Sequence, residues 1–193
     1  GTYKNGLHTG KWIRWYENGQ KHEEGTFDGK EDGLFTEWYE NGQKRYEKTY
    51  KNGEEDVLQT HWYENGSKKE EGTIKDGQNV LYTRWYENGQ KKGEGIYKDG
   101  KRDGLWAKWT VTGWKDREDK YQNGYLLGHY EYRKYQDGEI ERDSFNKNGV
   151  RDGQVVWWYP SGQKWMVMDW ESGDLISKKC WDEDGNESVC DDD

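Results

Sequence analysis

Histidine is the side chain best suited to acid–base chemistry or metal binding near neutral pH, and this chain has four. They are His8, His22, His61 and His129, and their spacing fits no metal-ligand pattern. No nucleophile motif built on Ser or Cys, no phosphate-binding glycine loop and no HExxH motif accompanies them. Each stands where other copies of a repeated pattern carry polar or variable residues. We therefore interpret them as surface residues and expect neither an enzyme nor a bound metal or cofactor.

An acidic segment near the end of the chain superficially resembles the start of a calcium-binding loop. Its sequence is DEDGNE, at residues 182–187. An EF-hand loop needs glycine at its sixth position and a helix on each side, whereas Glu187 occupies that position here. The segment aligns with the turn of a repeated unit, so we interpret it as a turn.

Two cysteines, Cys180 and Cys190, flank that turn. With Asp184 and Gly185 at its centre, Cys180 would pair with position 189, one residue from Cys190. A disulfide bond across a slightly bulged terminal hairpin is geometrically plausible, and two reduced thiols are the alternative. A disulfide would favour a periplasmic, cell-surface or secreted protein, and reduced thiols a cytoplasmic one.

The composition limits the fold and the partners. A net charge of −9 combined with few aliphatic residues would indicate disorder, but 13 Trp and 15 Tyr supply apolar surface in another form. The acidic charge disfavours binding to nucleic acid or to anionic lipid, which requires clustered Lys and Arg. No apolar run is long enough for a membrane span. A small-molecule substrate is not expected, because no polar groups converge.

The chain is built from repeats that carry two glycine turns each. The string WYENGQK or WYENGSK occurs four times, and four degenerate copies follow. Their turn glycines recur every 23–25 residues, and a second series of Asn-Gly or Asp-Gly pairs lies between them. Asn-Gly suits a two-residue type I′ hairpin turn, and only short strands fit between turns at this spacing. The eight copies start at Trp15, Trp38, Trp62, Trp85, Trp109, Lys134, Trp158 and Trp181.

The strand before each turn alternates with a period of two residues, which indicates β structure. One face carries Leu34, Thr36 and Trp38, and the same pattern returns in later copies. Stacked repeats would place Leu on Leu and Trp on Trp in a continuous ladder, which we expect to form the core. The expected ladder tryptophans are Trp15, Trp38, Trp62, Trp85, Trp109 and Trp158.

These patterns predict an all-β fold, an elongated single-layer antiparallel sheet of about eight tandem β-hairpin units. The whole chain, 1–193, is expected to be one repeat array. Residues 1–108 form regular units, 109–160 degenerate units, and 161–193 a C-terminal capping unit with an acidic tail. Strands are expected near residues 10–17, 20–27, 34–40, 43–50, 57–64, 67–74, 81–87 and 90–97.

The strand and turn pattern W-x-x-W-Y-x-N-G-Q-K, followed by E-G-x-Y-K-D-G-K-x-D-G, resembles the variant class of MORN repeats. This class is found in bacterial proteins that are often described as antitoxins of the YwqK type. The resemblance is strong over residues 1–108 and weaker from 109 to 193. It implies a MORN-like solenoid that acts as a scaffold or binds proteins without catalysis, and it carries no functional residues to transfer.

One stretch departs from the repeat. Second strands such as residues 21–27 are polar, but residues 157–170 are rich in Trp and Met. Strict alternation would place Trp165 and Val167 on one face and Met166, Met168 and Trp170 on the other. A strand that is apolar on both faces is covered on both, either by the C-terminal units folding over it or by a partner. The candidate partner-binding residues are Trp157, Trp165, Met166, Met168 and Trp170.

The sequence thus favours a non-catalytic protein-interaction or scaffold module of the bacterial cell envelope, whose partner is another protein. Two alternatives remain. One is a self-assembling structural or cell-surface protein, since the array begins partway through a repeat and edge strands can pair with another copy. The other is a carbohydrate binder that uses exposed aromatic rings.

Overall fold

The computed structural model describes residues 2–51, 54–75, 78–135 and 140–190. By their contacts these residues fall into two compact units. Unit 1 comprises residues 1–102 and 111–113, and unit 2 comprises residues 103–110 and 114–193. No helix occurs in the described residues, and thus none there could cross a membrane.

Short strands joined by tight turns make up both units. Those of unit 1 are β1 (Thr2–Lys4), β2 (Leu7–Trp15), β3 (Lys21–Asp28), β4 (Gly33–Trp38), β5 (Lys44–Lys51), β6 (Glu54–Trp62), β7 (Lys68–Lys75), β8 (Gln78–Trp85) and β9 (Lys91–Lys98). Those of unit 2 are β10 (Lys101–Trp109, starting at the end of unit 1), β11 (Lys115–Gln122), β12 (Tyr125–Lys134), β13 (Ile140–Asn146), β14 (Gly153–Trp158), β15 (Lys164–Glu171), β16 (Asp174–Trp181) and β17 (Glu187–Ser188).

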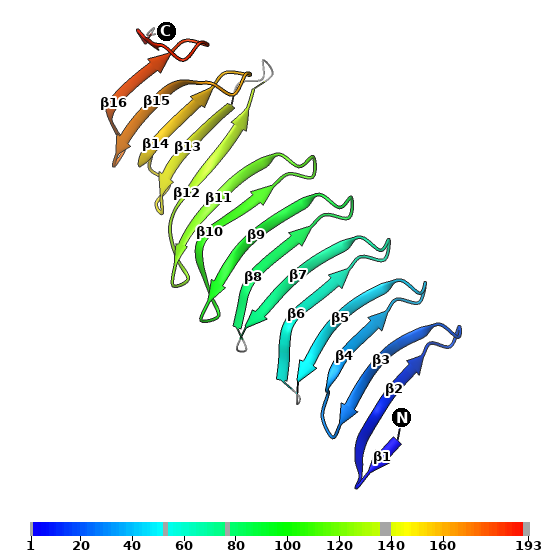
Figure 1. The fold of residues 1–193 in the computed structure, drawn as a ribbon. Coiled ribbons are helices and arrows are strands. Elements are labelled where there is room, and N and C mark those ends of the chain that lie inside the picture. Colours follow the sequence, from blue (N-terminus) through cyan, green and yellow to red (C-terminus); the bar gives the residue numbers. More distant parts are fainter. Residues whose placement is uncertain (1, 52–53, 76–77, 136–139, 191–193) are drawn as a thin grey trace. The chain divides into compact units, whose positions relative to one another are not determined.

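Within each unit, every strand pairs antiparallel with the strands that precede and follow it in the sequence. The strands of each unit lie side by side in a single layer (Figure 1). The expected all-β class, built from antiparallel hairpin repeats, is therefore confirmed. The observed first strands begin and end slightly earlier than expected, as β2 does at Leu7 and Trp15.

The turn type of the WYENG loops differs from the expected one. Tyr16 N donates to Gln20 O at 2.8 Å and Gly19 N donates to Tyr16 O at 3.0 Å, which leaves a loop of three residues. Gly19, with φ of +82°, closes it in the left-handed region. This is the three-residue hairpin, a type I turn followed by a left-handed glycine. The two-residue I′ geometry, with positive φ at both residues, occurs instead at some turns of the other series, as at Asn123 and Gly124, whereas at Gly29 and Gly149 only the glycine has positive φ.

The strands are nevertheless in the register that a two-residue turn would give. Trp12 lies opposite Gly25, and Arg14 opposite Glu23. A bulge at Trp15, which pairs with Lys21, absorbs the extra loop residue, and the same bulge recurs in the other complete WYENG hairpins of unit 1. The bulge therefore compensates for the longer loop.

The expected leucine ladder is wrong. Leu34 and Leu81 are 53% and 44% exposed in unit 1. The buried positions on the same face of the strands are instead Thr36, Thr60 and Thr83, each 5–6% exposed. In unit 2, Leu105 is likewise exposed, and burial is concentrated at Val155, Val156, Trp106, Met166 and Cys180.

The ladder tryptophans are less buried than expected. Trp15 is 58% exposed, whereas Trp38, Trp62, Trp85, Trp109 and Trp158 are half-buried. In unit 1 a lysine of the preceding hairpin lies over the ring, as Lys21 does over Trp38 at 5.3 Å and Lys44 over Trp62 at 5.5 Å. These are cation–π contacts rather than stacks of indole rings.

Hydrogen bonds reinforce each step from one hairpin to the next. Tyr39 Oη donates to Trp62 O at 2.8 Å and Asn41 Nδ2 donates to Glu64 O at 2.9 Å. Equivalent tyrosine bonds run from Tyr16 to Trp38 O and from Tyr63 to Trp85 O. The Tyr and Asn of the WYENG string therefore tie each turn to the one that follows it.

Candidate functional site

The candidate partner-binding residues meet on one face of unit 2. Across the β14–β15 pair, Trp157 lies opposite Met166, and Gly153 lies opposite Trp170. Val155 lies opposite Met168 between them, so all these residues share a face. We call Val155, Trp157, Trp165, Met166, Met168 and Trp170 the β15 apolar face.

Trp165 belongs to this face, contrary to the strict alternation expected from the sequence. A bulge shifts the register so that Trp158 pairs with Lys164 and Trp157 with Met166, which leaves Trp165 as the extra residue. Its ring centroid lies 5.7 Å from that of Trp157 and 6.2 Å from that of Tyr159. All five candidate residues are therefore gathered on one side of the sheet, because the bulge breaks the period of two.

The C-terminal strands do not fold over this face. β16 pairs edge to edge with β15, with Cys180 opposite Met166 and Lys178 opposite Met168. The expected cap is thus an extension of the same layer rather than a second layer. Met166 and Val155 are buried, while Trp157, Trp165, Met168 and Trp170 remain half-buried.

The rim of the β15 apolar face is aromatic and cationic. Tyr135 stacks on Trp157 with centroids 5.1 Å apart, and the guanidinium of Arg151 lies 5.1 Å from the ring centroid of Trp170. The indole nitrogens of Trp157, Trp165 and Trp170 are buried without a hydrogen-bond partner in the described residues. Buried donors of this kind are uncommon in folded proteins.

A buried charge cluster adjoins this face, and no feature of the sequence revealed it. Asp143 and Glu141 are 1% and 2% exposed. Arg151 binds the Asp143 carboxylate through Nε and Nη2, at 2.7 Å for the shortest contact. Arg133 Nη1 lies 3.0 Å from Glu141 Oε2, which also accepts a bond from Tyr135 Oη at 2.8 Å. The four charged side chains alternate in sign. Their pairing depends on β13 lying beside β12, so it cannot be read from the sequence.

The electrostatics of this cluster keep the Tyr135 hydroxyl neutral and the Arg133 guanidinium charged. Burial, followed by the Glu141 carboxylate, raises the pKa of the Tyr135 hydroxyl. Burial, the largest single effect, lowers the pKa of Arg133, but the attraction and hydrogen bond of Glu141 together with Tyr135 and Asp143 outweigh it and the pKa rises. These groups therefore hold the sheet together as ion pairs and hydrogen bonds.

The terminal hairpin carries the expected disulfide bond. Cys180 and Cys190 are joined, with Cα atoms 5.3 Å apart. The register is shifted by one from the expected one, since Cys180 lies opposite Ser188 rather than residue 189. The preceding acidic segment is a turn, because Asp182 N donates to Asn186 O and the Asp182 carboxylate accepts bonds from Asn186.

The four histidines pack against aromatic rings rather than standing free on the surface. His8 stacks on Trp12 with centroids 3.9 Å apart, and His129 on Phe145 at 4.9 Å. His22 and His61 lie against Tyr16 and Tyr46. Among the residues that the structure describes, no three His, Cys, Asp or Glu side chains gather as metal ligands would.

Comparison with known proteins adds one finding. The sequence profile of the MORN repeat variant matches four segments of the chain, residues 9–28, 31–52, 55–76 and 78–99. Each matched segment covers a strand pair of unit 1 with its connecting turns. No curated protein matches the chain.

Proposed function

With four MORN repeat variants in residues 9–99 as the premise, we propose that this protein is a non-catalytic protein-binding module. Its partner binds the β15 apolar face of unit 2. The observation that carries the proposal is the gathering of Trp157, Trp165, Met166, Met168 and Trp170 on one side of a single-layer sheet. Binding hot spots are rich in tryptophan, and methionine adapts to irregular partner surfaces.

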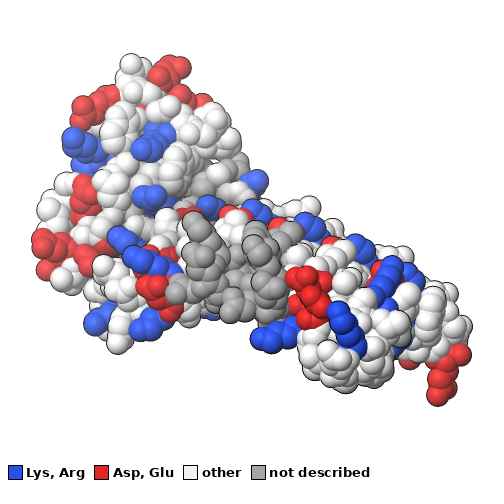
Figure 2. All heavy atoms as spheres, turned by 60° about the horizontal axis from the view of Figure 1, so that its bottom comes forward, with Lys and Arg blue, Asp and Glu red and all other residues white. Residues whose placement is uncertain are grey.

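The distribution of charge supports a protein partner over a polyanion. Figure 2 shows acidic and basic side chains interspersed over the visible surface rather than separated into fields of one sign. In unit 1 the lysines at positions 21, 44, 68 and 91 each pair with a glutamate three residues later. Lysines held in this way contribute little to a phosphate-binding patch.

The role of the ionisable groups supports the absence of catalysis. The most buried carboxylates, Asp119, Glu141 and Asp143, are all bound by Arg or Lys side chains. A general acid or base needs a proton that it can exchange near the working pH. Carboxylates held by cations in this way are suited to a structural role rather than to proton transfer.

The disulfide supports a location outside the reducing cytoplasm, in the periplasm, on the cell surface or in secreted form. An antitoxin of the YwqK type, which the sequence resemblance implies, would be a special case of the proposal in which the partner is a toxin. Co-expression with a captured partner that arrests growth would separate this case from a scaffold.

The test is affinity capture by the full chain and by two double variants. Met168→Ser with Trp170→Ser removes apolar surface from the β15 apolar face. Leu34→Ser with Leu81→Ser removes exposed apolar surface from unit 1 and serves as the matched control. We expect the first pair to abolish capture of a defined partner and the control to retain it. Equal capture by both variants would contradict the proposal.

Self-association is the second candidate function, and the outer edge of β16 favours it. β17 pairs with β16 only at Cys180 and Trp181, and Ile176 on the remaining edge is 61% exposed. An edge strand with exposed apolar residues can pair with another chain. Light scattering over a range of concentrations tests this, since a monomer at all concentrations would exclude it.

A further inference from the structure

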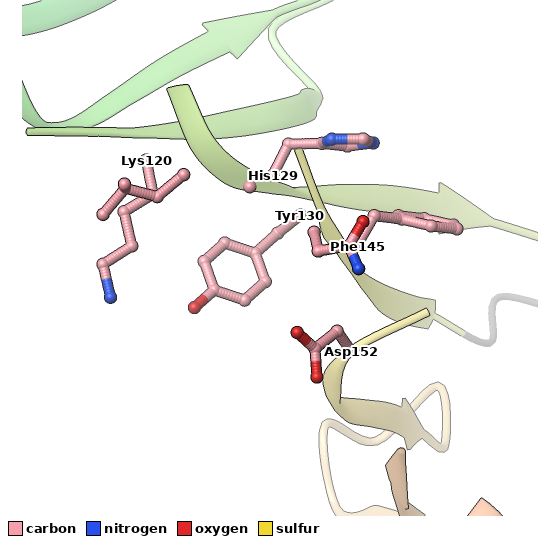
Figure 3. A pocket seen from close by; sticks show the side chains of 8 residues that line it. Lys120, His129, Tyr130, Phe145 and Asp152 are labelled. Carbon is pink, nitrogen blue, oxygen red and sulfur yellow. The ribbon is translucent and has the colours of Figure 1, made fainter. Parts of the chain in front are cut away.

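A hollow of about 170 Å³ lies in unit 2, on the side of the sheet opposite the rings of His129 and Phe145. Lys120 of β11, Leu127, Gly128 and Tyr130 of β12, and Asp152 just before β14 line it (Figure 3). All of these residues are in one compact unit. The hollow lies outside the β15 apolar face and shares no residue with it.

Gly128 forms part of the floor of the hollow. It pairs with Lys120 on one side and with Asn146 on the other, in the middle of three strands. A Cβ at this position would lie 2.4 Å from the carbonyl oxygen of Phe145, so the close approach of β13 admits no side chain. At Gly25 of unit 1, by contrast, the Phe35 ring fills the space, with Cδ2 2.9 Å from the corresponding Cβ position. At Gly128 the backbone of β13 fills this space instead.

Three polar groups without protein partners surround the hollow. Among the described residues, the Lys120 ammonium, the Tyr130 hydroxyl and the Asp152 carboxylate have no ion pair or side-chain hydrogen bond. Lys115 of the same strand pairs with Glu118 at 2.8 Å. Figure 3 shows the ends of Lys120, Tyr130 and Asp152 directed toward the same opening, while the rings of His129 and Phe145 stack on the other side.

We propose that this hollow binds a compact zwitterion of the α-amino-acid type. The ligand carboxylate accepts bonds from the Lys120 ammonium and the Tyr130 hydroxyl. The ligand ammonium donates to the Asp152 carboxylate, and an aliphatic side chain packs on Leu127, which is 42% exposed. One cation and one anion beside a glycine floor match a ligand with both charges on a short framework, and hydrogen bonds between charged groups are the strong ones.

The site is open to solvent on one side, so we expect weak binding, with a Kd on the order of 1 mM. Both charges of the ligand are needed. A carboxylic acid or an amine of the same carbon skeleton satisfies only one side of the hollow and leaves the other group of the protein with water.

The test is a titration of the full chain, labelled with ¹⁵N, with L-leucine to about 10 mM, followed by amide chemical shifts. The comparison ligands are 4-methylpentanoate, 3-methylbutylamine and glucose. We expect leucine to shift amides at residues 127–130 and 152 in a saturable way, and the three others to bind at least 10-fold more weakly. Saturable shifts with 4-methylpentanoate equal to those with leucine would overturn the assignment of a zwitterion.

Variants locate the binding. Lys120→Gln and Asp152→Asn each change one exposed side chain at the hollow, and Tyr130→Phe removes only a hydroxyl. The matched controls are Lys98→Gln and Asp174→Asn, also at exposed positions. We expect each hollow variant to weaken leucine binding at least 10-fold and the controls to leave it unchanged. Unchanged binding in all three hollow variants, or no saturable shift in the unaltered chain, would overturn the proposal.

Discussion

Three tryptophans of the WYENG strings contact the preceding hairpin both through the backbone and through the ring: Trp38, Trp62 and Trp85. The Trp38 carbonyl accepts a bond from Tyr16 Oη at 2.7 Å, and Lys21 Nζ lies over the ring. Residue alternation in the sequence correctly placed the ring on one face of the strand. It could not show that a lysine rather than a second indole covers the ring, because the lysine belongs to another hairpin and its path depends on the bulge at Trp15.

Truncating a tryptophan should reveal this partial cover. Trp62→Ala should lower the free energy of unfolding by about 3 kcal/mol, the lower end of the cost at a fully buried site, because most but not all of the side chain is covered. Trp15→Ala, at a ring that is 58% exposed, should cost below about 1 kcal/mol. Urea denaturation measures both changes. Equal costs would show that the position in the array does not govern the burial of these rings.

A second prediction at this scale concerns pH. Burial acts to raise the pKa of Asp119, but hydrogen bonds from Lys108 at 2.7 Å and Arg117 at 2.6 Å outweigh it, and the pKa is lowered. A carboxyl whose pKa is lower in the folded state stabilises the fold above its unfolded pKa and loses this contribution as pH falls through the folded value. We therefore expect the urea midpoint to fall as pH drops below about 4.

Asp119→Asn tests this assignment. It should cost about 1–3 kcal/mol at pH 7, because two cations lose their buried partner. It should also flatten the acid dependence of the urea midpoint. The control Asp174→Asn, at an exposed position, should leave the slope as it is. An unchanged slope in Asp119→Asn would assign the acid response to other carboxyls.

At the scale of the strand, the spacing of the glycines specified the hairpins and the alternation specified the faces. The turn type was misassigned, since the loops at Gly19 and its counterparts have three residues. The sequence does not distinguish the two loops, because a three-residue loop followed by a one-residue bulge leaves the same register as a two-residue turn. The bulge also explains why Trp165 lies beside Trp157 and not across the sheet from it. Bulges of this kind cannot be recognised from the two-residue alternation of the sequence.

Removing one hydrogen bond between hairpins should weaken the junction between them. Tyr39→Phe deletes the bond from Tyr39 Oη to Trp62 O and should lower the free energy of unfolding by about 1 kcal/mol. Tyr3→Phe, at a ring that is 64% exposed, is the control and should change it little. Amide hydrogen exchange should show faster opening at β5 and β6 in the first variant. Exchange that rises equally along the whole of unit 1 would mean that its hairpins do not open separately.

The terminal hairpin gives a prediction about covalent structure. Thiol titration of the unreduced, unfolded chain should find no free thiol, because Cys180 and Cys190 are bonded. Reduction should destabilise the β16–β17 hairpin by about 2–3 kcal/mol on the chain-entropy account. The loss should be local, with β2 to β9 unaffected. Two titratable thiols in the untreated protein would contradict both the bond and the proposed location outside the cytoplasm.

At the scale of the whole molecule, the repeat period predicted the array, and what it could not predict lies in unit 2. There the repeat pattern is degenerate, and the structure depends on contacts that occur once. Examples are the close approach of β13 to Gly128 and the pairing of Asp143 with Arg151. A pattern shared by several copies can be recognised from one sequence. A contact made once, between strands whose neighbours are known only after folding, cannot.

Deletion of one period should be tolerated. Removing residues 21–43 joins Gln20 to Lys44 and recreates the string WYENGQK at the junction. We expect the shortened chain to keep the β-rich circular dichroism spectrum per residue, with stability lower by the contribution of one repeat and its interface. Removing residues 29–43 instead deletes one strand, β4, and joins β3 directly to β5 without a turn, so it should disrupt the pairing of unit 1. Equal behaviour of the two deletions would contradict pairing governed by the period.

The near identity of the WYENG hairpins also makes the wrong neighbour a close competitor during folding. The correct partner of β3 is β4, but β8 has a similar residue pattern. The side chains of β3 therefore discriminate little between these two partners. What favours the correct pairing is the shorter loop, and each doubling of loop length adds only about 0.6 kcal/mol of closure cost. Synthesis from the N-terminus removes the competition, because each hairpin finds its neighbour before the next copy has left the ribosome. When the full chain refolds by dilution out of denaturant, all hairpins compete at once. Pairing of a hairpin with the wrong copy is then the expected misfolded state.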